Sequence, residues 1–288
     1  MTQFSRIWFV GLIASTSAAP LTAQPKKTTV PGAVPPPSAP PVVLLEAMDF
    51  AFKVPPTAPP GLVTLRLKNT GKSLHHVQLA RMNSGQTLAE FMTQLRKSPG
   101  SPGWREVEGG PSWAQSGQTA EVQLILAPGT YAVWCWIPSA DGQPHYMKGM
   151  YSKMEVVGGT PSKRADLVGD ISVVLSDYSF SLSAPLTSGL HTFRIENAGP
   201  QAHEFTIVKL AAGKTALDVL RWMEGGQQTS APGRLVGGTS SIAQGRVIGV
   251  TLGITPGEYA LICFTPEHLK RSGKPHADMG MMKTLTVQ

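Results

Sequence analysis

The sequence predicts an all-β protein made of two tandem β-sandwich domains, each interrupted by one short helix. Two observations support this fold class. The chain repeats itself at a constant offset of 128 residues, as from Asp49 to Asp177. Within each copy, short runs of alternating apolar and polar residues are separated by Gly and Pro, the pattern of half-buried strands joined by turns. A chain of 288 residues is long enough for two such domains, each with its own core.

The first 41 residues are expected to precede the folded domains. Arg6 is followed by an apolar run from Ile7 to about Ala19 and then by small residues, which is the layout of a secretory signal peptide. The run is shorter than the ~20 residues that span a bilayer. We therefore expect a signal peptide over residues 1–23, cleaved near Ala23, and a protein that is periplasmic or secreted. The Pro-rich residues 24–41 are expected to form an extended linker.

The repeat places the first domain at residues 42–158, a linker at 159–168 and the second domain at 169–288. Several short motifs recur in register, and they supply turn and strand residues at equivalent places in each copy. They are Asp49-Phe-Ala-Phe52 with Asp177-Tyr-Ser-Phe180, Gly61 with Gly189, Asn69 and Gly71 with Asn197 and Gly199, and Pro128-Gly-Thr-Tyr131 with Pro256-Gly-Glu-Tyr259.

The elements of each domain follow from local patterns. Alternation predicts strands in the first copy, with counterparts in the second, at Val63–Leu67, His75–Leu79, Val122–Leu126 and Tyr131–Trp136. A helix begins where Thr87 and Glu90 can form a capping box, and Thr215 with Asp218 repeats this signal in the second copy. The apolar stripes of both helices are expected to pack against the sandwich.

Composition and charge limit the classes of partner. Charged residues make up 15% of the chain and apolar residues 41%, as in ordinary globular proteins. The net charge of +7 falls to +4 when Arg6, Lys26 and Lys27 are left out. No cluster of Lys and Arg is interleaved with aromatic residues, so nucleic acid is not an expected partner. No later stretch is long and apolar enough to predict a membrane span.

The two cysteines of the chain occupy matching positions, and each is followed by a Pro-His and a Gly-Met pair. Cys135 precedes His145 and Met150, and Cys263 precedes His276 and Met281. A thiolate, an imidazole and a thioether form a donor set that suits copper. Each cysteine ends an apolar strand of its own domain, so we do not expect a disulfide between them.

Strand alternation adds a second histidine to each set. His75, Val77 and Leu79 share one face of their strand, and His203, Phe205 and Ile207 share it in the second copy. His76 and Glu204 point the other way. The predicted metal ligands are therefore His75, Cys135, His145 and Met150 in the first domain and His203, Cys263, His276 and Met281 in the second.

With these ligand sets, each copy resembles a cupredoxin, the fold of plastocyanin, azurin and the domains of copper nitrite reductases. The resemblance covers about residues 42–158 and 169–288. It is carried by Tyr131-Ala-Val-Trp-Cys135, followed by Pro144-His145 and Gly149-Met150. It implies a Greek-key β-sandwich in each domain, one type 1 (blue) copper per domain, electron transfer, and redox partner proteins.

The sequence departs from the cupredoxin pattern in two places. Nine residues separate cysteine and histidine in the first copy and twelve in the second, where His268 is a rival ligand to His276. The asparagine that usually follows the upstream histidine is replaced by His76 or Glu204, so the contacts that support the ligand loop are expected to differ.

Three other functions stay open. Met147, Met154, Met279 and Met282 would add thioether donors for copper handling or storage. A metal-free sandwich would use the same cysteines and methionines as core residues. Two-domain cuproenzymes share the fold, but they place histidine beside the cysteine, whereas Trp134 and Trp136 flank Cys135 and Ile262 and Phe264 flank Cys263. His76, His191 and His268 form no His-x-His pair. A two-histidine site between subunits of a homo-oligomer stays open, and we expect a carrier rather than an enzyme.

Overall fold

The computed structural model describes residues 39–97, 106–159, 167–267 and 273–288. Residues 39–288 form one compact unit. The expected signal peptide, most of the Pro-rich linker and His268 lie outside the described residues. None of the described helices is long and apolar enough to cross a membrane.

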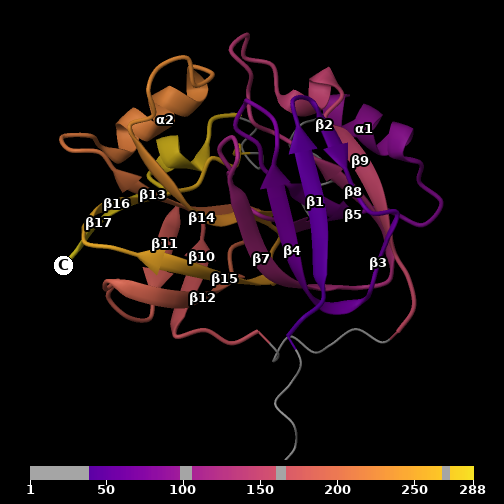
Figure 1. Ribbon diagram of the computed structural model, residues 1–288, viewed down its shortest axis with the longest axis horizontal. Helices are drawn as coiled ribbons and strands as arrows, with labels where there is room; N and C mark the ends of the chain where they lie inside the picture. Colours follow the sequence, from indigo (N-terminus) through magenta and orange to yellow (C-terminus); the bar gives the residue numbers. More distant parts are fainter. Residues whose placement is uncertain (1–38, 98–105, 160–166, 268–272) are drawn as a thin grey trace, which may run out of the picture. The chain divides into compact units, whose positions relative to one another are not determined.

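Strands dominate both repeats, with one α-helix and one short 3₁₀ turn described in each (Figure 1). The first repeat contains β1 (Val42–Met48), β2 (Ala51–Lys53), β3 (Thr57–Ala58), β4 (Gly61–Asn69), β5 (Gln78–Arg81), α1 (Leu88–Lys97), β6 (Val107–Gly109), β7 (Thr119–Leu126), β8 (Gly129–Trp134), a 3₁₀ turn (His145–Lys148) and β9 (Tyr151–Val156). The second repeat contains β10 (Ile171–Ser176), β11 (Ser179–Leu182), β12 (Gly189–Asn197), β13 (His203–Leu210), α2 (Ala216–Glu224), β14 (Gly233–Ile242), β15 (Val247–Ile254), β16 (Gly257–Ile262), a 3₁₀ turn (His276–Met279) and β17 (Met282–Val287).

The strands form two sheets, which confirms the predicted all-β fold. One sheet has the order β11-β10-β12-β15-β7-β4-β1-β2, and the other β17-β16-β13-β14-β6-β5-β8-β9-β3. β1 runs parallel to β4, and β10 runs parallel to β12, at equivalent places in the two repeats. Alternate residues of these strands are buried, so one face of each strand enters the core.

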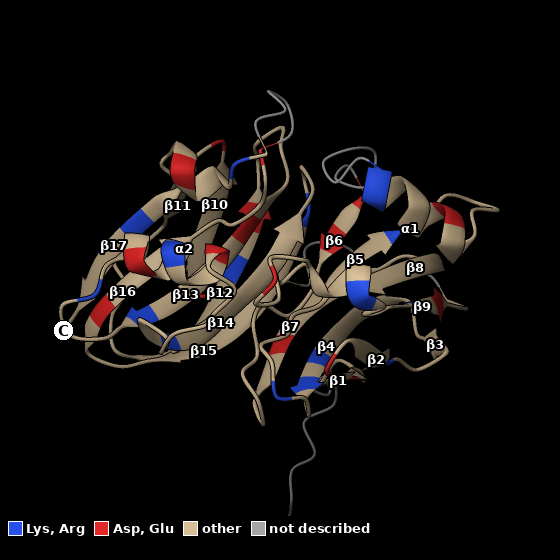
Figure 2. Cartoon of the chain, turned by 90° about the horizontal axis from the view of Figure 1, so that it is seen from above, with Lys and Arg blue, Asp and Glu red and all other residues tan. Residues whose placement is uncertain are grey.

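The two repeats join edge to edge in both sheets. β15 pairs with β7 at Gly249 and Gln123, and β14 pairs with β6 at Ile242 and Glu108. Pairing gives partners to backbone groups that an exposed edge strand would leave open. In Figure 2, acidic and basic residues are interspersed along the strands.

A buried asparagine holds the loop before each upstream histidine. The Asn69 side chain donates to the carbonyl oxygens of Ser73 and Ala114, both at 2.8 Å, and accepts from the Gly71 N–H at 2.9 Å. Asn197 repeats the pattern with the carbonyls of residues 201 and 242 and the N–H of residue 199. Each fully buried asparagine therefore makes two hydrogen bonds to its loop and a third to residue 114 or 242, which joins the loop to a distant segment.

Both helices begin as predicted. The Thr87 N–H donates to Oε2 of Glu90 at 2.8 Å, and the Glu90 N–H donates back to the Thr87 hydroxyl at 3.2 Å. Thr215 and Asp218 form the equivalent capping box. The apolar stripe of α1 covers a second small core that includes Phe91, whose ring lies 5.5 Å from that of Trp134.

The junction between the repeats contains a buried carboxyl group. Glu108 is 6% exposed and forms an ion pair with Arg246, with 2.7 Å between Oε1 and Nη2. Burial raises the pKa of Glu108 to about 7, against the lowering effect of the nearby Arg246 and Arg81 charges.

This raised pKa makes the stability of the metal-free protein depend on pH. The contribution of Glu108 is fully present below its unfolded-state pKa of about 4.3 and is lost as the pH rises through about 7. We expect Glu108→Gln to flatten the fall in the free energy of unfolding between about pH 5 and about pH 8, measured by urea denaturation. Glu121→Gln, at an exposed ion pair with Arg66, is the control and should leave the slope unchanged. Equal slopes for Glu108→Gln and the unmodified protein would contradict this prediction.

Candidate metal centres

Each repeat brings three of its four predicted ligands to the same end of the sandwich. In the first repeat, His75 lies between β4 and β5, Cys135 directly follows β8, and His145 begins the 3₁₀ turn. In the second repeat, β13 begins with His203, Cys263 directly follows β16, and His276 begins the other turn. The donor atoms of each trio lie within 4.8 Å of one another, and all six side chains are buried.

The two imidazoles of each site face one another through Nδ1. The distance between these nitrogens is 3.1 Å for His75 and His145 and 2.9 Å for His203 and His276. In each site the cysteine Sγ lies 3.6 Å from Nδ1 of the downstream histidine. The two sites therefore have nearly the same donor spacing.

Backbone hydrogen bonds hold the ligand loop of the first site in place. The Cys135 N–H donates to the Met150 carbonyl at 3.2 Å, and the Met150 N–H donates to the His145 carbonyl at 3.1 Å. The N–H of residue 146 returns to the Cys135 carbonyl at 2.9 Å. The second site repeats all three bonds, at 3.2, 2.9 and 2.9 Å, with Cys263, Met281, His276 and the N–H of residue 277.

The difference in length between the two ligand loops leaves the donor spacing of the sites nearly unchanged. Pro138 bridges to Pro144 in the first repeat, and Pro266 bridges to Pro275 in the second, so each loop is closed by an isolated β-bridge. Five residues separate the bridged prolines in the first repeat and eight in the second. His276 joins His203 and Cys263 in the second donor group, and its rival His268 lies outside the described residues.

Both methionines that follow the glycines are fully buried next to their sites. Met150 and Met281 precede β9 and β17 and exchange backbone hydrogen bonds with the cysteine and histidine ligands. Their role as thioether ligands stays a prediction.

A carboxylate lies behind each upstream histidine, which the sequence analysis did not identify as part of the site. Asp49 Oδ1 lies 3.1 Å from Nε2 of His75, and Asp177 Oδ1 lies 2.8 Å from Nε2 of His203. The carboxylate can accept a hydrogen bond from the Nε2–H of the imidazole. The lone pair of Nδ1 then faces the site. The only sequence signal was that both aspartates recur in the repeat.

This contact also explains a recurring glycine. A Cβ at Gly71 would lie 2.6 Å from Oδ1 of Asp49 and 2.9 Å from Nε2 of His75. A Cβ at Gly199 would meet Asp177 and His203 in the same way, at 2.8 and 2.9 Å. No larger residue fits beside the Asp–His pair without moving it.

An aromatic residue after each aspartate covers the downstream histidine. The Phe50 ring lies 5.0 Å from that of His145 in an edge-on contact, and the Tyr178 ring lies 5.4 Å from that of His276. Phe50 and Tyr178 have φ angles of 62° and 64°, a left-handed conformation that is unfavourable for bulky side chains. The same strained turn therefore directs a carboxylate to one ligand and a ring over the other.

The charges of the metal-free groups fit a cation site. Burial raises the pKa of both cysteine thiols to about 12 and lowers the pKa of His75, and that of His145 to about 4. Burial alone would raise the pKa of Asp49, but hydrogen bonds from Ser73, Lys72 and His75 lower it to about 2. Burial thus favours the neutral imidazoles of the first site, and each site offers a thiol that a bound cation would convert to the thiolate.

The donor spacing and donor types fit copper. Two nitrogens bound to one ion at about 2.0–2.1 Å must lie within about 4 Å of each other, as the paired Nδ1 atoms do. A thiolate with two imidazoles and an adjacent thioether is the donor set of blue-copper sites. The two His, Cys, His and Met groups, one per domain, are typical type 1 copper sites.

His76 and Glu204 stand where the cupredoxin pattern has an asparagine, and each accepts a hydrogen bond from the backbone of its ligand loop. Nε2 of His76 accepts from the Trp136 N–H at 3.1 Å, and Oε1 of Glu204 accepts from the Phe264 N–H at 2.8 Å. Each bond anchors the residue that follows the cysteine ligand. His76 therefore supports the site from outside the donor group, in agreement with the strand alternation.

Comparisons with known proteins give structural likenesses only. No protein-family model and no curated protein matches the chain. Reduced auracyanin from Roseiflexus castenholzii is 19% identical over 42% of this chain and 100% of its own, with a TM-score of 0.32. The Cu-containing nitrite reductase of Thermus scotoductus SA-01 is 15% identical over 87% of this chain and 62% of its own, with a TM-score of 0.25.

The blue copper oxidase of Nitrosomonas europaea is 16% identical over 85% of both chains, with a TM-score of 0.26. Scores this low support no inference about this chain. The all-β architecture in two sheets and the two donor groups, by contrast, agree with the cupredoxin resemblance found in the sequence.

The Asp–His pair can be tested in a Cys263→Ser background, in which only the first site keeps its thiolate. We expect Asp49→Ala to weaken Cu(I) binding about 10- to 100-fold, because the ligating imidazole loses the partner that orients it. Competition with a Cu(I) chelator measures the affinity. Asp49→Asn keeps an acceptor for the loop N–H groups and separates loss of charge from loss of loop structure.

The matched control is Asp141→Ala. Asp141 is an exposed aspartate of the same ligand loop, where its carboxylate pairs with Lys148 at 2.7 Å. The Cu(I) affinity should not change in this variant. If Asp49→Ala and Asp141→Ala bind Cu(I) equally well, Asp49 does not position His75.

Proposed function

We propose that the protein is an exported electron carrier with one type 1 copper site in each domain, serving redox partner proteins in the periplasm or outside the cell. The observation that carries this proposal is the buried contact of two imidazoles and a thiol, present twice with nearly the same spacing. Bound copper would supply one-electron chemistry between Cu(I) and Cu(II) at each site.

The protein residues would hold the ligands fixed and keep water away. The cysteine and both histidines of each site are at most 2% exposed, and Phe50 or Tyr178 covers the downstream histidine. The ligand loop is tied by backbone hydrogen bonds, and Asp49 or Asp177 orients the upstream imidazole. A site that moves little between its two oxidation states suits electron transfer.

Burial of the methionines argues against a storage role. Met154 is fully buried in the core, and Met279 and Met282 are partly buried, with Met282 packed against the core. Among these four methionines, Met147 is the one that is exposed. A storage surface would need several accessible thioethers, so we favour electron transfer over storage.

Aromatic neighbours of the cysteines argue for a carrier rather than an enzyme. Trp134, Trp136 and Phe264 stand where a histidine would have to lie to connect a second copper. Among the other described histidines, His76 bonds to a backbone N–H and His191 pairs with Asp170 at 2.7 Å. We therefore propose no catalytic site.

The proposal predicts a colour. Purified protein loaded with Cu(II) should develop an intense blue or green thiolate charge-transfer band, because Cu(II) bonded to a cysteine sulfur absorbs strongly in the visible. The band should be lost in the Cys135→Ser, Cys263→Ser double variant, and absorption spectroscopy during titration measures it. Each single variant should keep about half of the band if both sites bind copper.

Three other results would contradict the proposal in different ways. Colourless protein that binds Cu(I) tightly would indicate copper handling, and protein that binds neither ion would indicate a metal-free sandwich. Turnover of nitrite or a phenol above the rate of free copper would indicate an enzyme.

A further inference from the structure

We propose that the chain contains a built-in route for electron exchange between its two copper sites, from Cys263 through Phe264, Trp113 and Ala114 to His75. The route rests on the proposed electron-transfer function. Two of its steps are covalent, since Phe264 directly follows the Cys263 ligand and Trp113 directly precedes Ala114.

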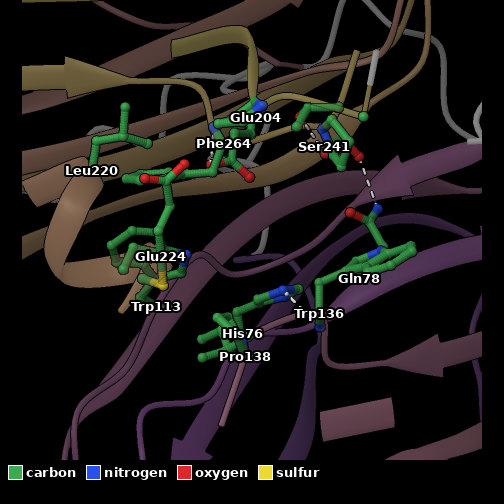
Figure 3. A pocket seen from close by; sticks show the side chains of 16 residues that line it. His76, Gln78, Trp113, Trp136, Pro138, Glu204, Leu220, Glu224, Ser241 and Phe264 are labelled. Atoms are coloured by element: carbon green, nitrogen blue, oxygen red, sulfur yellow. Dashed lines mark hydrogen bonds between the residues drawn. The ribbon is translucent and has the colours of Figure 1, made fainter. Parts of the chain in front are cut away.

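A ring contact across the two repeats forms the centre of the route. The Phe264 and Trp113 rings lie 4.5 Å apart between centroids, with an interplanar angle of 46°. This distance is at the short end of the range for aromatic pairs, about 4.5–7 Å. Figure 3 shows both side chains on one side of the pocket between the repeats. Trp113 is 6% exposed, so packing holds its indole in position.

A pair of backbone hydrogen bonds connects Trp113 to the first site. The Ala114 N–H donates to the His75 carbonyl at 2.8 Å, and the His75 N–H donates to the Ala114 carbonyl at 3.1 Å. Asn69 donates to the same Ala114 carbonyl. Electron tunnelling weakens most steeply across gaps between groups that are not bonded. This route contains one tight ring contact and one hydrogen bond, and the remainder is covalent.

The repeat itself shows that this contact is specific to one side of the junction. The residue equivalent to Trp113 is Ser241, at the offset of 128 residues. Its hydroxyl bonds to that of Thr265 at 2.6 Å, and its carbonyl accepts from Gln78 at 2.8 Å. Trp136, which follows Cys135, packs its ring 4.8 Å from Tyr146 within its own repeat.

A cavity marks this difference between the repeats. Ser241 and Trp136 both line a cavity of about 210 Å³, which Trp113 and Phe264 border as well. In Figure 3, Trp136 and Ser241 lie across the pocket from Trp113 and Phe264. Two aromatic rings in contact therefore connect Cys263 toward His75. The equivalent connection from Cys135 toward His203 is missing its tryptophan, because Ser241 occupies that position.

The exchange itself is a one-electron step. With copper bound at both sites, the site holding Cu(I) would be oxidised to Cu(II) and the site holding Cu(II) would be reduced to Cu(I). No bond forms or breaks, and no proton moves. A carrier with this route could accept an electron at one site and release it from the other.

Exchange can be measured in half-reduced protein loaded with copper at both sites. NMR exchange spectroscopy on amide signals near each site reports the two oxidation states separately, and a rate independent of protein concentration is intramolecular. We expect Trp113→Leu to slow this exchange about tenfold or more, because it removes the aromatic contact. Trp113→Phe keeps a ring against Phe264 and should retain most of the rate.

Trp136→Leu is the matched control, because Trp136 also follows a cysteine ligand and lines the same pocket. Its exchange rate should equal that of the unmodified protein. Both charge-transfer bands must persist in every variant, and cross-relaxation between the Trp113 and Phe264 rings checks the contact in metal-free protein.

Two outcomes would overturn the route: an unchanged rate in Trp113→Leu, or equal slowing in Trp113→Leu and Trp136→Leu. Absence of concentration-independent exchange in blue, fully loaded protein would overturn it as well. Absence of the charge-transfer bands would instead contradict the proposed function, so the two failures can be told apart.

Discussion

The contact between three buried donor atoms is the constraint on which the rest of the structure depends. A thiol and two imidazole nitrogens face one another in each domain, and burial disfavours the charged forms of both thiols and of the first-domain imidazoles. Burying polar groups costs free energy that hydrogen bonds must offset, and a bound cation would give the three donor atoms of each site a common partner. The protein offsets this cost on the far side of each ligand, where carboxylates and backbone groups complete the hydrogen bonding.

Backbone geometry explains why two copies with different residues hold equivalent sites. The hydrogen bonds among the cysteine, histidine and methionine positions use main-chain groups, so they persist when neighbouring side chains change. The Pro138–Pro144 and Pro266–Pro275 bridges close the ligand loops, and the length difference lies between the bridged prolines. His76 and Glu204 differ in chemistry, but each accepts a hydrogen bond from the N–H of the residue that follows the cysteine.

The differences between the copies lie around the sites rather than within them. Tyr178 covers the downstream histidine where the first copy has Phe50, and Ser241 stands where the first copy has Trp113. These changes leave the donor spacing intact but give the two sites different surroundings and different contacts across the junction. The two repeats therefore share the scaffold that holds the donor atoms, whereas substitutions around the donor atoms give the two sites different surroundings.

The amino-acid sequence by itself determined the repeat, the strand and helix types, and the six residues that meet in the two donor groups. These features depend on periodicity, capping residues and residue order, which are local properties of a chain. Only the tertiary structure decided that Asp49 binds His75, that Phe50 covers His145, and that Phe264 meets Trp113 from the other repeat. Such contacts join positions far apart in sequence, and no local pattern specifies which of many aspartates or aromatic rings will meet a given partner.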